Sequence, residues 1–531
     1  MNNRKKFESA FLAFQEGRSI EAINICEDIL SVQPDDPDTL HLLAILHHDL
    51  QDTKRAEHYC RQALTCSPEN YYAHFLMSTI CLETGNLDEA LIHLQKAADI
   101  NPGSPDAAYN LAIIYERTGQ YENALDAYKK VLSMNPDAAD VHNNIGNLFR
   151  RMQDPDQAVL HLRKALRINP EYLLALNNLS LALRDKGLHD EALLQVQKAI
   201  ELDPDIPDAY FTLALILNDR GERDGAVSSL EKAIGLNPFF ADAYYNLALI
   251  LKEQGQTDKA EENLRKVVGA DPSFADAYCT LAIIHEEKGQ FDNALSFYRK
   301  ALEIRPDDAE IHWNMSLVFL TIGNFLPGWA EYEWRFLVQK FDQRILNIPR
   351  WDGSSLNGKA LFITAEQGVG EEIMFASCLS EVLSHADRCI IECDKRLIPL
   401  FSRSFPGISV SARSGAGDKS PSYLPLPDMR ISIGSLPKFF RRHLSGFPRQ
   451  KSYLIPDIHK AELWRQRYND MGRGKKVGIS WRGGGKPFEK LTRSTSLLQW
   501  KELFSIPEVH FINLQYGDCT GDLREARETL G

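Results

Sequence analysis

Residues 237–270 read NPFFADAYYNLALILKEQGQTDKAEENLRKVVGA, and the same pattern recurs along the chain every 34 residues. Its proline belongs to a series that keeps this interval without a slip: Pro34, Pro68, Pro102, Pro136, Pro170, Pro204, Pro238, Pro272 and Pro306. Two series of small residues keep it too. They are Ala10, Ala44, Ser78, Ala112, Gly146, Ser180, Ala214, Ala248, Ala282 and Ser316, and Ala22, Ala56, Ala90, Ala124, Ala158, Ala192, Ala226, Ala260 and Ala294. Because helices approach closely only where side chains are small, the two series predict a repeated pair of antiparallel helices.

A glycine stands between the two small residues of most copies, at Gly17, Gly85, Gly119, Gly187, Gly221, Gly255, Gly289 and Gly323. It can take the left-handed conformation that ends the first helix, and the proline ends the second. Gln51 and Gln153 are the exceptions. The pattern resembles the tetratricopeptide repeat, with nine full copies from residue 3 to 308 and a degenerate tenth from about Ala309. The resemblance implies an α superhelix, a solenoid whose concave groove binds a protein or peptide.

A polar side chain stands two positions before the small residue of the first helix, at Asn110, Asn144, Asn178, Thr212, Asn246, Thr280 and Asn314. An amide can both donate to and accept from a peptide backbone. This series, which we call the file, resembles the asparagine ladder with which the repeats of O-GlcNAc transferases hold extended polypeptide. The resemblance implies a peptide-binding role for its asparagines. The alternative is a solvated or inter-repeat hydrogen-bonding position. Leu42 and Leu76 occupy the file earlier, so a groove ligand should favour the later copies.

Charge is distributed unevenly along the chain. Residues 1–340 contain 32 Lys and Arg against 52 Asp and Glu, a net charge of −20, and residues 341–531 carry a net charge of +7. An acidic file in the first turn of the first helix contributes to this: Asp38, Asp106, Asp140, Asp208, Asp242, Asp276 and Glu310. Compensation of the helix dipole explains most of this file, and ligand contact is the alternative. The acidic repeats disfavour nucleic acid and suit basic or neutral polypeptides, unless they only aid solubility, and the basic remainder suits anionic substrates such as sugar nucleotides.

Length and composition limit the classes of protein to which the chain can belong. A chain of 531 residues with 44% hydrophobic content can form more than one packed core. The sequence shows neither a secretory leader nor an apolar run long enough for a membrane span, which predicts a cytoplasmic protein. The nine cysteines form no CxxC pair and no cluster with histidine at zinc spacing, so neither a metal nor another cofactor is predicted.

The periodicity fails after Phe325, and strand-like runs follow at residues 359–364, 389–393 and 429–433. The first leads into a turn with Gly368 and Gly370 and then an amphipathic helix. A second such series starts at Lys475, with KKVGISWRGGG as strand and turn, a helix at 497–505, and VHFINLQYGD as the next strand. The order predicts a repeat domain at 3–340, an α/β Rossmann-like half at 341–474, and the start of a second half at 475–531.

The run IPRWDGSSLNGKALFITAEQGVGEEIMFAS, together with EYEWR, ISWRGG, RSTSL and NLQYGD, resembles bacterial repeat proteins that carry a heptosyltransferase-like domain of GT-B fold. The resemblance implies a base for the acceptor hydroxyl after a Gly-x-Gly turn, where this chain has Glu371 in place of aspartate. It also implies contacts to the donor phosphates near Gly368, Gly370, Arg482, Lys486 and Arg493. The alternatives are a first-turn carboxylate for Glu371 and ordinary solvated charge for each cation.

Two functions remain open. One is a metal-independent sugar transfer from a nucleotide sugar to a polypeptide held in the groove, and the other is a protein-binding scaffold with a glycosyltransferase remnant. A complete second half needs roughly 130 to 150 residues, and residues 475–531 provide 57. The second half is therefore expected to be incomplete, as a fragment, a truncated product or an adapted relative.

Overall fold

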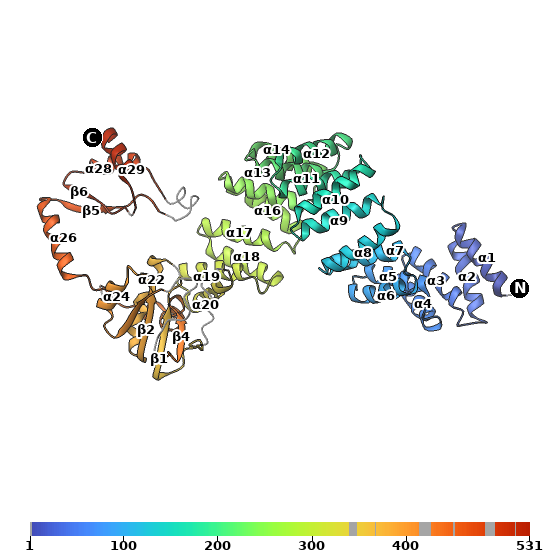
Figure 1. Cartoon of the computed structure of the whole chain (residues 1–531), viewed down its shortest axis with the longest axis horizontal. Helices are drawn as coiled ribbons and strands as arrows, with labels where there is room; N and C mark the ends of the chain where they lie inside the picture. The colour runs from blue at the N-terminus through green and yellow to red at the C-terminus, as the bar shows by residue number, and fades with distance from the viewer. Residues whose placement is uncertain are drawn as a thin grey trace. The chain divides into compact units, whose positions relative to one another are not determined.

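The computed structural model describes residues 3–338, 348–366, 368–413, 426–449, 452–483, 494–515 and 517–530 (Figure 1). The chain divides into two compact units, Met1–Ile284 and His285–Gly531. We call them the first unit and the second unit and describe each by itself. None of the helices within the described ranges is long and apolar enough to cross a membrane.

The first unit consists of alternating helices, which we call A helices (odd numbers) and B helices (even numbers). The A helices are α1 (Asn3–Gln15), α3 (Pro37–Asp49), α5 (Tyr71–Glu83), α7 (Pro105–Arg117), α9 (Ala139–Arg151), α11 (Leu173–Asp185), α13 (Pro207–Asp219), α15 (Ala241–Glu253) and α17 (Ala275–Glu287), the last of which ends just beyond the boundary of the unit. The B helices are α2 (Ser19–Leu30), α4 (Thr53–Cys66), α6 (Leu87–Ile100), α8 (Tyr121–Met134), α10 (Pro155–Ile168), α12 (His189–Leu202), α14 (Arg223–Leu236) and α16 (Thr257–Ala270). Two further helices of the pattern, α18 (Phe291–Ile304) and α19 (Ala309–Thr321), belong to the second unit. The predicted helical solenoid, of about 19 helices, is confirmed.

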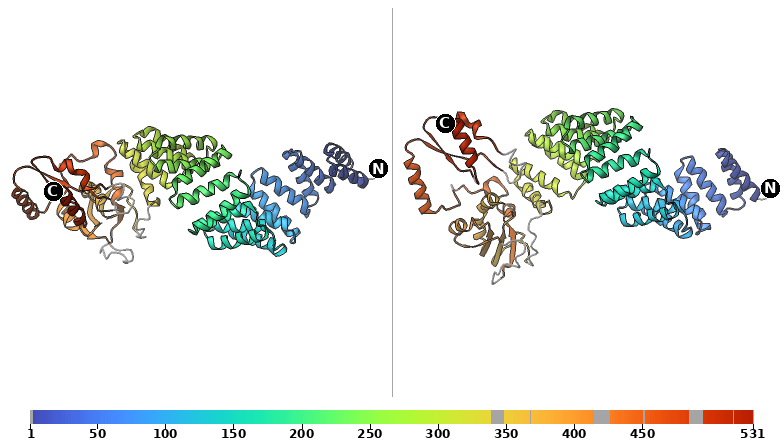
Figure 2. Two further views of the ribbon diagram at one scale, coloured as in Figure 1. Left: turned by 90° about the horizontal axis from the view of Figure 1, so that it is seen from above. Right: turned by 45° about the horizontal axis from the view of Figure 1, so that its top comes forward.

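The small residues lie where the helices meet, as predicted. From α1 to α16 each A helix packs against the B helix that follows it, and each pair packs against the next, as Figure 2 shows from two directions. Ala112 and Ala124, one from each series, are fully buried. At Gly146 an added Cβ would lie 2.5 Å from Cγ of Leu162 on the partner helix. A side chain larger than the native one therefore has no room at these crossings.

The turn between the helices of a pair has a left-handed residue in every copy. The eight glycines of the series have φ between 71° and 80°, and Gln51 and Gln153 take φ of 60° and 61° in the same place. Glutamine thus adopts a conformation that favours glycine, because the turn geometry requires it.

The second unit continues after α19 with α20 (Phe325–Glu331), the 3-10 turn η1 (Tyr332–Trp334) and α21 (Arg335–Val338). A parallel four-stranded sheet follows, with β1 (Leu356–Thr364), β2 (Ala386–Cys393), β3 (Ile408–Ala412) and β4 (Met429–Ser432) in the order β3-β2-β1-β4. Its other elements are α22 (Val369–Phe375), η2 (Ala376–Cys378), α23 (Leu379–Leu383), α24 (Ile398–Ser404), η3 (Ile433–Ser435), α25 (Pro437–Phe440) and α26 (Ile458–Asp470). The predicted α/β region is therefore present, and β3 is a strand that the sequence analysis did not identify.

One apolar core joins the last helices of the repeats to this sheet. Leu361 and Ile363 of β1 are fully buried in it, and Tyr332 belongs to the same cluster. Trp329 packs against the cluster and donates from Nε1 to the carbonyl oxygen of Arg441, 3.0 Å away. The segment after the repeats is thus part of the sheet's own core.

Towards the end of the chain, β5 (Lys475–Ile479) and β6 (Val509–Asn513) form a separate parallel pair. The elements near them are η5 (Leu497–Trp500), α28 (Lys501–Phe504) and α29 (Thr520–Leu530). The strand, helix and strand order that the sequence predicts for this stretch is confirmed.

Candidate functional site

Neighbouring A helices are joined by polar contacts between residues 35 positions apart. Arg150 Nε lies 2.8 Å from Asp185 Oδ2, and Arg184 Nε lies 2.6 Å from Asp219 Oδ2. His48 Nε2 and Glu83 Oε2 are 3.0 Å apart in the same arrangement. We call the surface on which such contacts connect consecutive A helices the A-helix face.

Two of the predicted asparagines form a hydrogen-bonded chain on this face. Asn144 Nδ2 donates to the hydroxyl of Tyr109 at 2.9 Å, and Asn178 Nδ2 donates to Asn143 Oδ1 at 2.9 Å. Asn143 Nδ2 completes the chain by donating to Asn144 Oδ1 at 3.2 Å. The amides of α9 and α11 and the tyrosine hydroxyl of α7 are thereby linked across three consecutive copies.

The other asparagines of the file are not part of that chain. Asn246 Nδ2 donates within its own helix, to the carbonyl oxygen of Asp242 at 2.8 Å. Asn110 and Asn314 are half-buried, like the rest of the file's asparagines, and Asn314 belongs to the second unit. The structure therefore brings together Asn144 and Asn178, and it leaves the remaining three apart from them.

Two further asparagines, Asn143 and Asn177, directly precede residues of the file and were not predicted as part of the site. Asn143 is buried, and Asn177 has a buried side-chain oxygen that no donor reaches among the residues that the structure describes. The doublets Asn143–Asn144 and Asn177–Asn178, which recur at the repeat interval, were the available signal.

The acidic file lies exposed in the first turn of the A helices. Partial desolvation by the surrounding protein, followed by the nearby Asp271 and Asp208 carboxylates, raises the pKa of Asp242 above its ordinary value although its side chain stays in contact with solvent. Neighbouring copies therefore contribute to one negative potential along this edge of the A-helix face.

The predicted catalytic region lies where β1 ends. Gly368 precedes α22, and Glu371 and Glu372 stand in its first turn. Glu371 is half-buried, and a Cβ at Gly368 would lie 3.1 Å from its Oε2 atom, whereas one at Gly370 would have open space. Glu372 is 2% exposed and accepts a hydrogen bond from the backbone N–H of Asp394 at 2.8 Å. Burial raises the pKa of Glu372, so the second glutamate is a structural group that joins α22 to the end of β2.

The same edge of the sheet holds a buried ion network that sequence analysis did not foresee. The Arg335 guanidinium, 0% exposed, donates from Nε and one Nη to the two carboxylate oxygens of Glu366, both at 2.8 Å. It also donates to the hydroxyl of Ser435 at 2.9 Å. Glu366 in turn accepts from the N–H of Gly434 at 3.0 Å. These residues close the gap between the ends of β1 and β4, where the strand order reverses.

Of the predicted donor-binding cations, Arg482 has strong partners of its own. Its Nε lies 3.1 Å from Asp522 Oδ2, which also accepts from Trp481 Nε1 at 2.7 Å. A cleft of about 420 Å³ lies beside Trp481 and Arg482 and reaches Ser494. Lys486 and Arg493 lie outside the described residues.

Comparison with known families identifies the helical pairs. Tetratricopeptide-repeat models match residues 72–137 and 104–171, residues 143–207 and 245–309, and residues 214–255. The helical pairs are tetratricopeptide repeats. A model of anaphase-promoting complex, cyclosome, subunit 3, also matches residues 17–97. All of these matches lie within the repeat region and leave the α/β region to be interpreted from its own structure.

Individual proteins resemble parts of the tetratricopeptide-repeat chain. Protein FlbA of Caulobacter vibrioides is 32% identical over 227 residues, which cover 40% of this chain and 38% of FlbA. The chain thus spans less than half the length of that relative. A crystal structure of MamA is 33% identical, covers 31% of this chain and 97% of MamA, and has a TM-score of 0.28. YrrB, described as a tetratricopeptide-repeat protein with an unusual peptide-binding site, is 23% identical over 35% of this chain and 95% of YrrB, with a TM-score of 0.29.

Proposed function

We propose that the A-helix face of the first unit binds an extended polypeptide. The observation that carries the proposal is the file of half-buried amides on the A helices α7, α9, α11 and α15. In the described part of the chain, Asn144, Asn178 and Asn246 each use one amide N–H group for the protein bonds given above. An amide has two such groups, so each can donate the second to a peptide carbonyl.

The chemistry of the face favours a basic segment. The exposed acidic file runs beside the amides, and the Asp208 carboxylate is close enough to contribute to the raised pKa of Asp242. Extended polypeptide presents backbone groups at regular intervals whatever its sequence, so the amides supply affinity for the backbone. The carboxylates then select lysine or arginine side chains.

The experiment combines Asn144→Ala, Asn178→Ala and Asn246→Ala in the full chain and measures binding to an array of synthetic extended peptides that differ in basic content. We expect basic peptides to bind the native chain and to lose about tenfold or more in affinity, roughly 1.4 kcal/mol, with the triple variant. Asn123→Ala is the matched control, because its amide lies on a B helix and donates to Gln120. Unchanged affinity with the triple variant, at an unchanged melting temperature, would remove the proposal.

A second candidate function is sugar transfer by the α/β region, favoured by one observation. The strand order reverses between β1 and β4, and Glu371 stands just beyond the carboxyl end of β1. In open α/β sheets, ligands bind outside the carboxyl ends of the strands at such a reversal. Glu371 would act as the base, and Arg482 would have to exchange Asp522 for a donor phosphate.

Calorimetric titration of the full chain with UDP-, GDP- and ADP-sugars tests this candidate. Saturable binding that Arg482→Ala abolishes, together with transfer that Glu371→Gln abolishes, is the expected result. An absence of binding to all three classes of nucleotide sugar would reject sugar transfer and leave the peptide-binding proposal untouched.

A further inference from the structure

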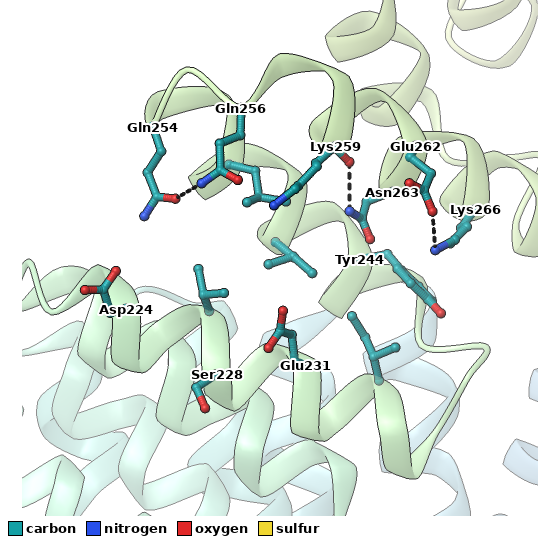
Figure 3. Close-up of a pocket in the computed structure, with 14 residues that line it drawn as sticks. Asp224, Ser228, Glu231, Tyr244, Gln254, Gln256, Lys259, Glu262, Asn263 and Lys266 are labelled. Atoms are coloured by element: carbon teal, nitrogen blue, oxygen red, sulfur yellow. Dashed lines mark hydrogen bonds and ion pairs between the residues drawn. The ribbon is translucent and has the colours of Figure 1, made fainter.

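A cleft of about 640 Å³ opens between the B helices α14 and α16, with α15 as its floor (Figure 3). Val227 and Ile234 of α14 and Leu247 and Leu251 of α15 give it an apolar lining. Figure 3 shows Asp224, Ser228 and Glu231 on one wall and Lys259 and Lys266 on the other. The cleft lies between B helices, whereas the asparagine file lies on A helices.

The equivalent junctions one and two copies earlier are closed by an ion pair. Lys186 Nζ lies 2.5 Å from Asp156 Oδ1, and Arg220 Nη1 lies 2.6 Å from Asp190 Oδ1. At the cleft, the position of the cation is taken by Gln254, which accepts from Gln256 Nε2 at 2.9 Å. Asp224, the counterpart of Asp190, has no cation partner within the described ranges.

A second bridge found elsewhere between B helices is absent here as well. Arg61 pairs with Glu89 at 2.6 Å and Arg163 with Glu191 at 2.7 Å, in each case across 28 residues. The same two positions at the cleft hold Glu231 and Lys259. These two residues line opposite walls and form no ion pair with each other in the part of the chain that is described.

The wall formed by α14 also carries a smaller side chain than the equivalent B helices of the two preceding copies. Ser228 occupies the position at which three earlier copies place a large exposed aliphatic residue, namely Ile92, Leu160 and Leu194, which are 58%, 43% and 63% exposed. The other copies carry a polar residue there, as at Asp126 and Ser296. Gln254, Glu231 and Ser228 therefore distinguish this junction from the two junctions before it. An apolar floor between two walls of opposite charge, left open by the missing ion pair, gives this space the chemistry of a binding site.

We propose that this cleft binds an amphipathic helical segment of a partner protein. Asp224 and Glu231 are seven residues apart on α14, and Lys259 and Lys266 are seven residues apart on α16, about two helical turns in each case. A helix laid in the cleft would place an apolar stripe against Val227, Ile234 and Leu247. It would carry basic residues at i and i+7 on the flank that faces α14, and acidic residues at the same interval on the opposite flank.

On the α16 wall, Lys266 already pairs with a carboxylate of its own helix. Lys266 Nζ lies 2.9 Å from Glu262 Oε1 and 5.6 Å from the centre of the Tyr244 ring. Both Lys266 and Glu262 are exposed, so the pair is held weakly and can exchange Glu262 for an acidic residue of the partner. The opposite signs of the two walls also fix the direction in which the partner helix lies.

The test is a selection with the full chain from a displayed library of amphipathic helices of about 18 residues, or five turns. Each flank of these helices is randomised among Lys, Arg, Asp, Glu and Ala. We expect enrichment of helices with one basic and one acidic flank. Exchanging the charges of the two flanks in a selected peptide should weaken its binding, followed by fluorescence anisotropy, by about tenfold or more.

Ser228→Leu restores the aliphatic residue that three earlier copies carry, and Gln254→Arg restores the bridge to Asp224. Each should reduce binding of the selected peptides by about tenfold or more while the melting temperature is kept. Leu194→Ser, the same position one copy earlier, is the matched control and should leave binding unchanged. The proposal fails if selected helices show no charge pattern, or if both variants bind them as well as the native chain does.

Discussion

Each unit is stabilised internally, and the contacts within the first unit span a different sequence range from those within the second. In the first unit, polar contacts between helices join residues about one repeat apart, as in Arg150 with Asp185. In the second unit, Arg335 donates a hydrogen bond to Ser435, which is 100 residues away in the sequence, and Trp329 donates one to the carbonyl oxygen of Arg441, 112 residues away. A substitution in the first unit should therefore act locally, whereas one at the centre of the second should affect that unit as a whole.

The largest effect is expected for Arg335→Met. The substitution leaves the Glu366 carboxylate, 7% exposed, without its bidentate partner. Removing one member of a buried ion pair costs about 3–5 kcal/mol, since the other charge stays buried. Urea unfolding monitored by tryptophan fluorescence should show the transition of the second unit at a clearly lower concentration.

Arg150→Met is the matched control, because its pair with Asp185 is partly exposed and is worth about 0–1 kcal/mol. Its effect should appear only in the transition of the first unit, which contains no tryptophan and is therefore followed by circular dichroism. Similar losses from the two substitutions would contradict the contrast between local and long-range stabilisation.

The sequence predicted the first unit well because its decisive contacts repeat. Each small residue, each turn glycine and each asparagine could be located by counting 34 residues, and even Gln51 and Gln153 were identified as exceptions to the glycine series. The Arg335–Glu366 pair was not predictable in this way, because its residues occur once and meet only after the sheet has formed. Strand β3 is a different case, because its sequence ISVSA does alternate apolar and polar residues, and the signal was missed because it is only five residues long.

Gly146→Ala tests how tightly the helix pairs are packed. Alanine alone would favour the helix, but its Cβ would lie 2.5 Å from Cγ of the buried Leu162. Overpacking of this kind costs about 1–3 kcal/mol, which exceeds the gain in helix propensity. Thermal unfolding followed by circular dichroism should show a lower melting temperature.

Gly235→Ala is the control for that experiment. Gly235 lies within helix α14, and a Cβ there would meet no heavy atom within 4 Å. The same chemical change should therefore stabilise the protein by about 0.5–1 kcal/mol. Shifts of the same sign at both positions would show that packing at Gly146 is looser than the distances indicate.

A smaller, pH-dependent effect is expected at His161, whose Nδ1 lies 3.1 Å from Nδ1 of His142. Burial, with Lys164 and His142 next in importance, lowers the pKa of His161 to about 4. The unfolded chain binds this proton near pH 6.5, so the stability that His161 contributes is complete above that pH and is lost as pH falls towards 4. Between pH 7.5 and 5, His161→Gln should lose about 2 kcal/mol less stability than the native chain, measured by urea unfolding.

The smallest effect concerns the two glutamines in the left-handed turn. The left-handed conformation costs a residue with a side chain about 1–2 kcal/mol of folding free energy. Glycine removes this strain, but it also increases the conformational entropy of the unfolded chain, which offsets part of the gain. Gln153→Gly should therefore stabilise the first unit by about 0.5 kcal/mol, and Gly187→Gln, at the equivalent turn in the next copy, should destabilise it by a similar amount. Both changes are measured as shifts in the urea midpoint. If Gln153→Gly instead destabilised the unit, the glutamine side chain would be making contacts that offset its strained backbone, and the turn would not be interchangeable between copies.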